Sequence, residues 1–217
     1  MTAPEILFQD KRFIVINKPA GLPVHATRAS GPSVEDFFPL WSKSKSGPWL
    51  AHRLDRDTAG CLVIALKKSA LLAAQALFAN GSVSKTYWAI VAGTPNQSEG
   101  EIDLPLEKTT IGKSWRMTAS AGGPPASTRW RLLGSSGSKT WLELHPHTGR
   151  THQIRAHCAA IGHPIIGDPV YGDGKGTLCL LARAILLPLD PPVGAIAPVP
   201  PHMLQTLRDC GWSHDQK

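Results

Sequence analysis

The residues best suited to chemistry lie in a short charged segment that precedes an apolar stretch. His52-Arg53-Leu54-Asp55-Arg56-Asp57 places two carboxylates among two arginines, and the apolar run 61–66 follows closely. Such a run predicts a buried strand, which would fix the position of the charged loop that precedes it. The segment could therefore supply a catalytic carboxylate with a cationic partner. It could also form a structural ion pair where the chain enters the strand.

A second group of hydrogen-bond donors lies in the later half of the chain. Residues 145–157 read HPHTGRTHQIRAH and continue through Gly-Asp-Pro-Val-Tyr-Gly at 167–172. Residues 151–161 have helical spacing, with Gly162 as the terminator, so His152 and Arg155 should share one face while apolar residues occupy another. One face would then pack, and the other would offer donors.

Together these segments resemble the RluA-type family of RNA pseudouridine synthases. The resemblance extends to Asn17-Lys18-Pro19-Ala20-Gly21 near the start and to Ser84-Lys85-Thr86-Tyr87 in the middle, in the family's order. It implies an isomerase that breaks the N1–C1′ bond of a uridine within RNA, turns the uracil and rejoins it through C5. This reaction consumes no cofactor and needs no metal, and the sequence has no glycine-rich nucleotide loop.

The resemblance places the catalytic role on Asp55, which must be ionised within a pocket that excludes water. Burial alone would discharge an aspartate, so a neighbouring guanidinium is a physical requirement. Arg155 best matches the family's partner for the aspartate, and Arg53 and Arg150 are alternatives. Asp57 is the rival carboxylate, and we expect it to brace the loop.

Tyr87 matches the family's aromatic residue that packs on the target base, although a strand tyrosine followed by Trp88 could equally be part of a core. Arg53, Tyr87 and Arg155 are thus the predicted substrate-binding residues. The residues predicted to support them are His52, Leu54, Arg150, His152 and Leu180. Where the family often has Leu-His-Ala, this chain has Leu180-Leu181-Ala182, so the leucine that lines the uracil pocket is either Leu180 or Leu181.

The histidines do not form a convincing metal site. His152 and His157 are five residues apart on the expected helix, which turns them to different faces, and no carboxylate or cysteine has a matching offset. We expect no metal, and we expect the histidines to contact phosphates or to brace loops.

Composition favours an RNA partner and a reducing compartment. Lys and Arg number 23 against 16 Asp and Glu, a net charge of +7 that suits a polyanion. The four cysteines are far apart and form no disulfide framework, and Cys158 should be a core residue. No apolar segment reaches the roughly 20 residues that span a bilayer, and the start of the chain does not read as a secretory signal. A cytoplasmic monomer without membrane contact is expected.

The pattern of segments predicts an α+β fold with a mixed, mainly antiparallel β-sheet flanked by helices. We expect one catalytic domain over residues 1–217, with no N-terminal S4-type module. Strands are expected near 5–8, 12–17, 61–66, 87–91, 113–119, 126–133, 139–145 and 177–187. Helices are expected near 34–41 with Ser33 as cap, from Ser69 to Asn80-Gly81, over 151–161, and over 201–210.

Ribosomal RNA, transfer RNA or both are the expected substrates, and a paired uridine would have to be extruded. The sequence leaves open whether Asp55 acts first as a nucleophile or as a base. One alternative is a catalytically silent RNA-binding or RNA-folding factor on the same scaffold. Another is a hydrolase that uses Asp55 and Asp57 as an acid/base pair and would release free uracil.

Overall fold

The computed structural model describes residues 2–26, 31–43, 46–112 and 114–213. The chain forms two compact units, Met1–Lys85 with Ala182–Pro198, and Thr86–Leu181 with Val199–Lys217. Each unit is described by itself. The unit boundaries fall inside strands β5 (Ser84–Ala92) and β11 (Leu180–Leu187), so each of these strands contributes residues to both units. The single catalytic domain expected over residues 1–217 stays a prediction.

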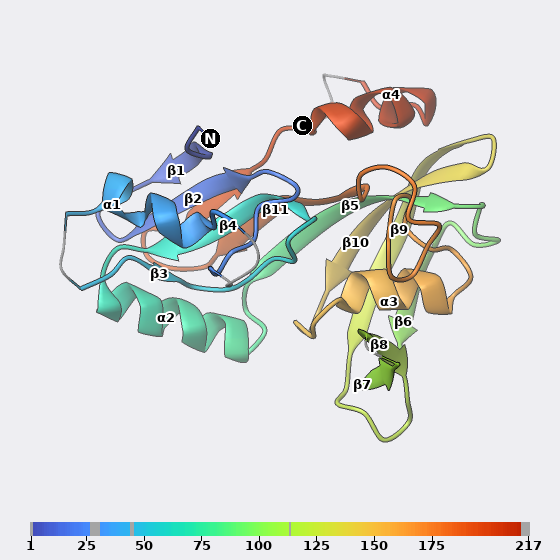
Figure 1. Ribbon diagram of the computed structural model, residues 1–217, viewed down its shortest axis with the longest axis horizontal. Helices are drawn as coiled ribbons and strands as arrows, with labels where there is room; N and C mark the ends of the chain where they lie inside the picture. Colours follow the sequence, from blue (N-terminus) through green and yellow to red (C-terminus); the bar gives the residue numbers. More distant parts are fainter. Residues whose placement is uncertain (1, 27–30, 44–45, 113, 214–217) are drawn as a thin grey trace. The chain divides into compact units, whose positions relative to one another are not determined.

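The first unit is a sheet with the strand order β1-β2-β4-β11, in which β3 also pairs with β4 and β12 with β11 (Figure 1). Its elements besides β11 are β1 (Glu5–Gln9), β2 (Phe13–Lys18), the 3-10 helix η1 (Val34–Phe37), α1 (Phe38–Trp41), β3 (Trp49–Leu50), β4 (Ala59–Ala65), α2 (Lys68–Ala79) and β12 (Val193–Ile196). The strands expected near 5–8 and 12–17 form an antiparallel hairpin as β1 and β2, and β2 also pairs antiparallel with β4. Every residue of β4 is buried, as its apolar sequence predicts.

Gly60 is needed where β4 meets β11. Its φ is +109°, and a Cβ at this position would collide with the carbonyl of Ala182. A side chain is therefore excluded both by backbone conformation and by the close approach of the neighbouring strand. This contact fixes the strand that follows the charged loop.

The helices of the first unit largely follow the sequence signals. The carboxylate of Asp36 accepts hydrogen bonds from the amide (2.6 Å) and hydroxyl (3.1 Å) of Ser33, which confirms the predicted cap of the 34–41 segment. Helix α2 packs on β3 and β4 and ends at Ala79, with Asn80 as its C-cap and Gly81 at φ +75° as expected. The expected cap at Ser69 is wrong, because Lys67 already has the extended cap conformation and the helix begins at Lys68.

The second unit is built on antiparallel strands in the order β5-β10-β9-β6, with a separate β7–β8 hairpin. Its elements besides β5 are β6 (Glu99–Asp103), β7 (Leu106–Ile111), β8 (Ser114–Ala119), β9 (Ser127–Ser136), β10 (Lys139–Pro146), α3 (Gln153–Ala160) and α4 (Pro201–Asp209). Helix α3 contacts β10 and β8, and α4 begins at Pro201, the first residue of the range expected for it.

The observed α+β architecture with a mostly antiparallel sheet confirms the predicted fold class. The strands β3, β6, β7 and β12 were not predicted, and residue 113 of the expected 113–119 strand lies outside the described residues. Among the residues that the structure describes, no helix is long and apolar enough to cross a membrane.

Candidate active site

Asp55 lies in the loop that enters β4, where the sequence places it. Its side chain is partly buried, Leu54 beside it is buried at 5% exposure, and Arg53 is exposed. The amide of Thr58 donates to the carbonyl of Asp55 (3.2 Å), which closes a turn with Asp57 inside it. The turn therefore holds both carboxylates near the start of a fully buried strand.

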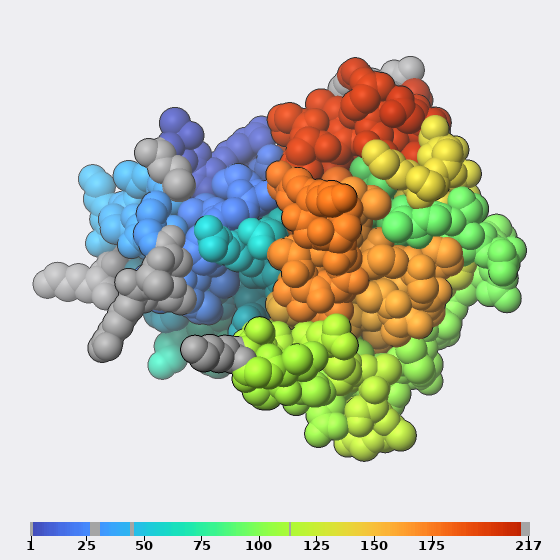
Figure 2. Space-filling model, turned by 45° about the vertical axis from the view of Figure 1, so that its right-hand side comes forward, coloured from blue at the N-terminus to red at the C-terminus, as the bar shows by residue number. Residues whose placement is uncertain are grey.

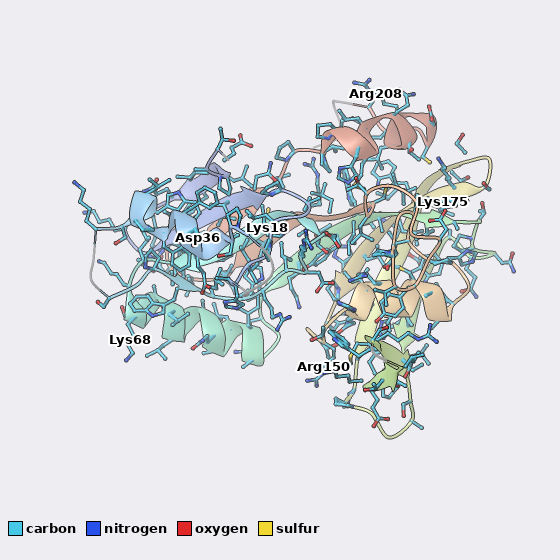
Figure 3. All side chains as sticks on the ribbon, viewed as in Figure 1. Lys18, Asp36, Lys68, Arg150, Lys175 and Arg208 are labelled. Carbon is cyan, nitrogen blue, oxygen red and sulfur yellow. The ribbon has the colours of Figure 1, made fainter. Side chains whose placement is uncertain are left out.

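A buried cation that the sequence analysis did not assign lies beneath this loop. Lys18, the last residue of β2, is fully buried, and its Nζ donates to the carbonyls of Pro19 (3.0 Å), Leu22 (2.8 Å) and Arg56 (2.8 Å). Three acceptors match the three N–H donors of an ammonium group. Figure 3 labels Lys18 within the first unit.

The charge of Lys18 is coupled to the acidic loop. Burial lowers the pKa of Lys18 to about 7, while attraction to Asp57 and Asp55 works against that shift. The amide of Gly21 also donates to the Arg56 carbonyl (3.0 Å), and Arg56 Nε returns a bond to the Gly21 carbonyl (3.1 Å). The loop after β2 and the Asp55 loop are thus joined around one ammonium group.

His52 braces the other side of the loop. Its Nε2 accepts a hydrogen bond from the amide of Val63 (3.0 Å), and its ring lies 4.8 Å from the ring of Phe78 in α2. Burial, with a smaller contribution from the charge of Lys85, lowers the pKa of His52 to about 3. The imidazole is therefore neutral near pH 7 and ties the loop to both β4 and α2.

In the second unit, the segment before α3 is organised around Gln153. Its Oε1 accepts from the Thr148 hydroxyl (2.6 Å) and the Arg150 amide (3.0 Å), and its Nε2 donates to the carbonyl of Ser127 (2.9 Å). Arg150 is exposed, and its Nε donates to the Pro125 carbonyl (3.1 Å) (Figure 3). His152 has a φ of +52°, so the helix begins at Gln153 and not at Thr151.

Arg155 forms a buried ion pair with Asp168. Nε lies 2.7 Å from Oδ2 and Nη2 lies 2.8 Å from Oδ1, with the residues 4% and 0% exposed. Burial alone would raise the pKa of Asp168, but Arg155 and the amides of Val170 and Tyr171 hold it below its ordinary value. The expectation that Arg155 lies on an open donor face of α3 is wrong, because the helix is buried from Gln153 through Cys158.

The predicted base-contacting and pocket residues lie on the strands shared by the two units. Tyr87 is partly buried in β5, while Trp88 packs edge-on against Trp141 at 4.8 Å between ring centroids. Leu180 and Leu181 begin β11 and are both buried, at 3% and 0% exposure.

Two further histidines brace the second unit. His157 contacts the Thr128 hydroxyl (2.9 Å) and the Leu104 carbonyl (3.0 Å), and His163 contacts the Ala92 carbonyl (2.9 Å). Cys158 is fully buried, as predicted for a core residue. No group of three or more His, Cys, Asp or Glu that could hold a metal ion occurs within the described part of the chain.

The structure thus gathers the predicted residues into two sets. His52, Arg53, Leu54 and Asp55 share one loop of the first unit, whereas Arg150, His152 and Arg155 surround the start of α3 in the second. Asp55 and Arg155 belong to different units, so the pairing between them stays a prediction. The sequence analysis assigned no role to Lys18 or Asp168, although both lie in the motifs that carry the family resemblance. For Lys18, the available signal was a charge at the end of an apolar strand, and for Asp168 it was a charge between a glycine and a proline.

Comparison with known proteins shows which family this chain resembles. The RNA pseudouridylate synthase family model matches residues 12–160. An uncharacterized RNA pseudouridine synthase of Zymomonas mobilis is 43% identical over 176 residues, which cover 80% of each chain. The ribosomal large subunit pseudouridine synthase D of the same bacterium is 37% identical over 180 residues, 79% of this chain and 56% of that protein. The solved structure of human RNA Pseudouridylate Synthase Domain Containing 4 has a TM-score of 0.80 at 30% identity, covering 94% of this chain and 92% of that one.

The fold and these matches define an isomerase that acts on RNA. The chain belongs to the RNA pseudouridylate synthase family, and its relatives include the ribosomal large subunit enzymes. The RluA-type resemblance and the predicted isomerase activity are thereby confirmed.

Proposed function

We propose that the protein converts specific uridines of ribosomal or transfer RNA into pseudouridine, with Asp55 as the catalytic carboxylate. The observation that carries this proposal is the family match over residues 12–160, which includes both the Asp55 loop and Arg155. The name of the ribosomal large subunit relative supports ribosomal RNA as one substrate. We extend the proposal to a single catalytic domain that acts as a cytoplasmic monomer.

The reaction defines what Asp55 must do. The N1–C1′ bond breaks, a C5–C1′ bond forms, the C5 hydrogen leaves as a proton and N1 gains a proton. An ionised carboxylate can begin this sequence by attacking the sugar or the base, or by removing a ribose proton. In each case the anion is the active form, and it interacts favourably with the buried ammonium of Lys18.

Arg155 is the proposed second partner of Asp55. Its contact with Asp168 uses Nε and one Nη2 hydrogen, which is one edge of the guanidinium group. A guanidinium has five N–H donors, so its geometry provides a second edge for another carboxylate. Holding the first edge with a buried carboxylate would fix the direction of the second, which is the precision that a catalytic aspartate needs.

The remaining site residues are proposed to bind the substrate. Tyr87 would pack on the uracil, a contact worth about 1–3 kcal/mol for a base on an aromatic ring. Arg53, exposed beside the catalytic loop, would contact RNA from which the target base has been extruded. His52, Leu54, Arg150, His152 and Leu180 would support the pocket without a metal or cofactor.

The test compares pseudouridine maps of ribosomal and transfer RNA from cells that lack the protein and cells restored with wild type, Asp55→Asn or Asp57→Asn. We expect one or a few sites to disappear without the protein and to return with wild type but not with Asp55→Asn. Asp57→Asn removes a carboxylate two residues away and should retain measurable turnover.

A purified assay separates the alternatives. RNA labelled with tritium at uridine C5 should release tritium as the new C–C bond forms, while the uracil stays in the RNA. Free uracil would favour the hydrolase that uses Asp55 and Asp57. Binding of RNA without tritium release or any change in the maps would favour the silent RNA-binding factor.

A further inference from the structure

The β7–β8 hairpin is attached to the rest of the second unit through the side chain of Tyr171. The Tyr171 hydroxyl accepts a hydrogen bond from the backbone amide of Met117 in β8 (2.8 Å). The Tyr171 ring and Met117 both pack on a cluster formed by Leu106, Ala126 and Ala156. One aromatic residue from the turn after Asp168 therefore contacts β7, β8 and α3 together.

The same hydroxyl is part of an aromatic stack at the start of α3. His152 Nδ1 lies 3.3 Å from the Tyr171 hydroxyl, and the two rings meet edge-on at 5.8 Å between centroids. The His152 ring is also stacked on Trp115 of β8, with 5.1 Å between the ring centroids and 19° between the ring planes. His152 is the only non-glycine residue with positive φ among the described residues, and such backbone strain persists only where the surroundings determine it.

Tyr171 also contacts the arginine proposed to orient the catalytic carboxylate. The Arg155 guanidinium carbon lies 5.4 Å from the centre of the Tyr171 ring, within the range of a cation–π contact. The turn that carries Tyr171 is anchored by Asp168, whose Oδ1 accepts from the amides of Val170 (2.8 Å) and Tyr171 (3.1 Å). The carboxylate that pairs with Arg155 therefore also places the ring that packs on it.

The hairpin held by this hydroxyl presents a surface that suits RNA. Trp115 is 40% exposed, and Lys108 on β7 places its ammonium 4.8 Å from the Trp115 ring. Arg116 is exposed on β8, the strand that carries Trp115. The hairpin lies at the molecular surface and is yellow-green in Figure 2. An aromatic ring among cations can bind a polynucleotide through stacking and phosphate contacts.

We propose that Tyr171 is a positioning residue, whose hydroxyl fixes the β7–β8 hairpin and whose ring fixes Arg155. One side chain would then determine both the position of the RNA-binding hairpin and the orientation of the arginine in the active site. This inference rests on the proposed role of Arg155. The two functions belong to different atoms of Tyr171, so separate substitutions can remove them one at a time.

The experiment compares Tyr171→Phe and Tyr171→Leu with wild type and Ser120→Ala. Tyr171→Phe keeps the ring over Arg155 but removes the acceptor of the Met117 amide. Ser120→Ala is the matched control, because it removes a hydroxyl at the end of the same hairpin that donates to the carboxylate of the exposed Glu107 (2.9 Å). The substrate is bulk RNA from cells that lack the protein, grown with uridine tritiated at C5.

We expect Tyr171→Phe to raise KM about 3- to 10-fold, because the hydroxyl that contacts both Met117 and His152 is lost. Hydrogen exchange of the Met117 amide, measured by NMR without RNA, should become about 5- to 10-fold faster, because this amide loses its acceptor. Tyr171→Leu should in addition lower kcat about tenfold or more, because Arg155 loses the ring that orients it. Ser120→Ala should change neither quantity.

Unchanged KM and unchanged Met117 exchange in Tyr171→Phe would overturn the role of the hydroxyl. A Tyr171→Leu protein with wild-type kcat would overturn the role of the ring, and if that variant does not fold, Tyr171→Phe still decides the first part. The Met117 exchange rate does not depend on catalysis. Turnover retained by Asp55→Asn would therefore refute the proposed catalytic role of Asp55. The Met117 exchange rate would still test whether the Tyr171 hydroxyl holds the hairpin.

Discussion

Replacing Asp168 with asparagine should expose how strongly the buried pair holds the second unit together. Asparagine has nearly the same shape, and its oxygen can still accept from Val170, Tyr171 and Arg155 Nη2, the three donors now on Oδ1. It loses the negative charge, and its NH2 group would face Arg155 Nε, which now donates to Oδ2 at 2.7 Å. The guanidinium would remain buried, at 4% exposure, without the charge of Asp168.

The expected cost follows from that burial. Removing one partner of a buried ion pair typically costs 3–5 kcal/mol, because the other charge is left without compensation. Three of the four hydrogen bonds can survive, so we expect the lower end, about 3 kcal/mol. In a chain of this size each kcal/mol shifts the melting temperature by roughly 2–4 °C, which gives a decrease of about 6–12 °C.

The measurement is urea and thermal unfolding of wild type, Asp168→Asn and the control Asp173→Asn. Asp173 is exposed, and its side chain accepts from the Lys175 amide (3.1 Å), so the same substitution there should change stability by less than about 0.5 kcal/mol. A third protein, Asp168→Asn with Arg155→Met, removes the stranded charge and should recover much of the stability while remaining inactive. A loss below about 1 kcal/mol in Asp168→Asn, or no recovery in the double variant, would refute the reasoning.

Three further predictions concern other residues. Lys18→Met should lower kcat at least about tenfold in the tritium-release assay, because it removes the ammonium that joins the two loops and attracts Asp55, the proposed catalytic residue. Glu143→Gln should lower the free energy of unfolding in urea by about 1–2 kcal/mol at pH 7. The hydrogen bond from His145 lowers the pKa of Glu143 to about 2, so the stabilisation by this carboxylate is present above pH 4.5 and disappears as the pH falls toward 2. Gly60→Ala should cost more than about 3 kcal/mol or prevent folding, whereas Gly122→Ala, which meets nothing within 4 Å, should keep wild-type solubility and melting temperature.

The elements that the sequence predicted well are those whose burial produces a periodic or continuous apolar pattern. Strand β4 reads AGCLVIA and is buried along its whole length, and α2 combines helix-forming residues with a glycine stop. Strand β6 reads EGEID, and only Ile102 in it is buried, so it has no pattern to recognise. Its pairing with β9 supplies the backbone hydrogen bonds that make it a strand, and such pairing cannot be read from one segment alone.

The candidate site shows the same division between local and distant information. The loop position of Asp55 follows from local residues, because a charged turn before an apolar run is visible in the sequence. The Arg155–Asp168 pair joins residues 13 positions apart across the end of a helix, and the Lys18–Arg56 contact joins residues 38 apart. Helical periodicity predicted an open donor face for Arg155, but it could not show that Asp168 would pair with this arginine in a helix that is buried from Gln153 through Cys158.

The burial of Arg155 changes how its proposed role must be understood. A guanidinium already matched by Asp168 carries little uncompensated charge, so a second carboxylate would gain less from its net charge than from the fixed direction of its N–H donors. Within its own unit, Asp55 is attracted by the buried ammonium of Lys18. In the proposed site, Lys18 would therefore attract Asp55 from within the same unit, and Arg155, held by Asp168 and Tyr171, would orient it.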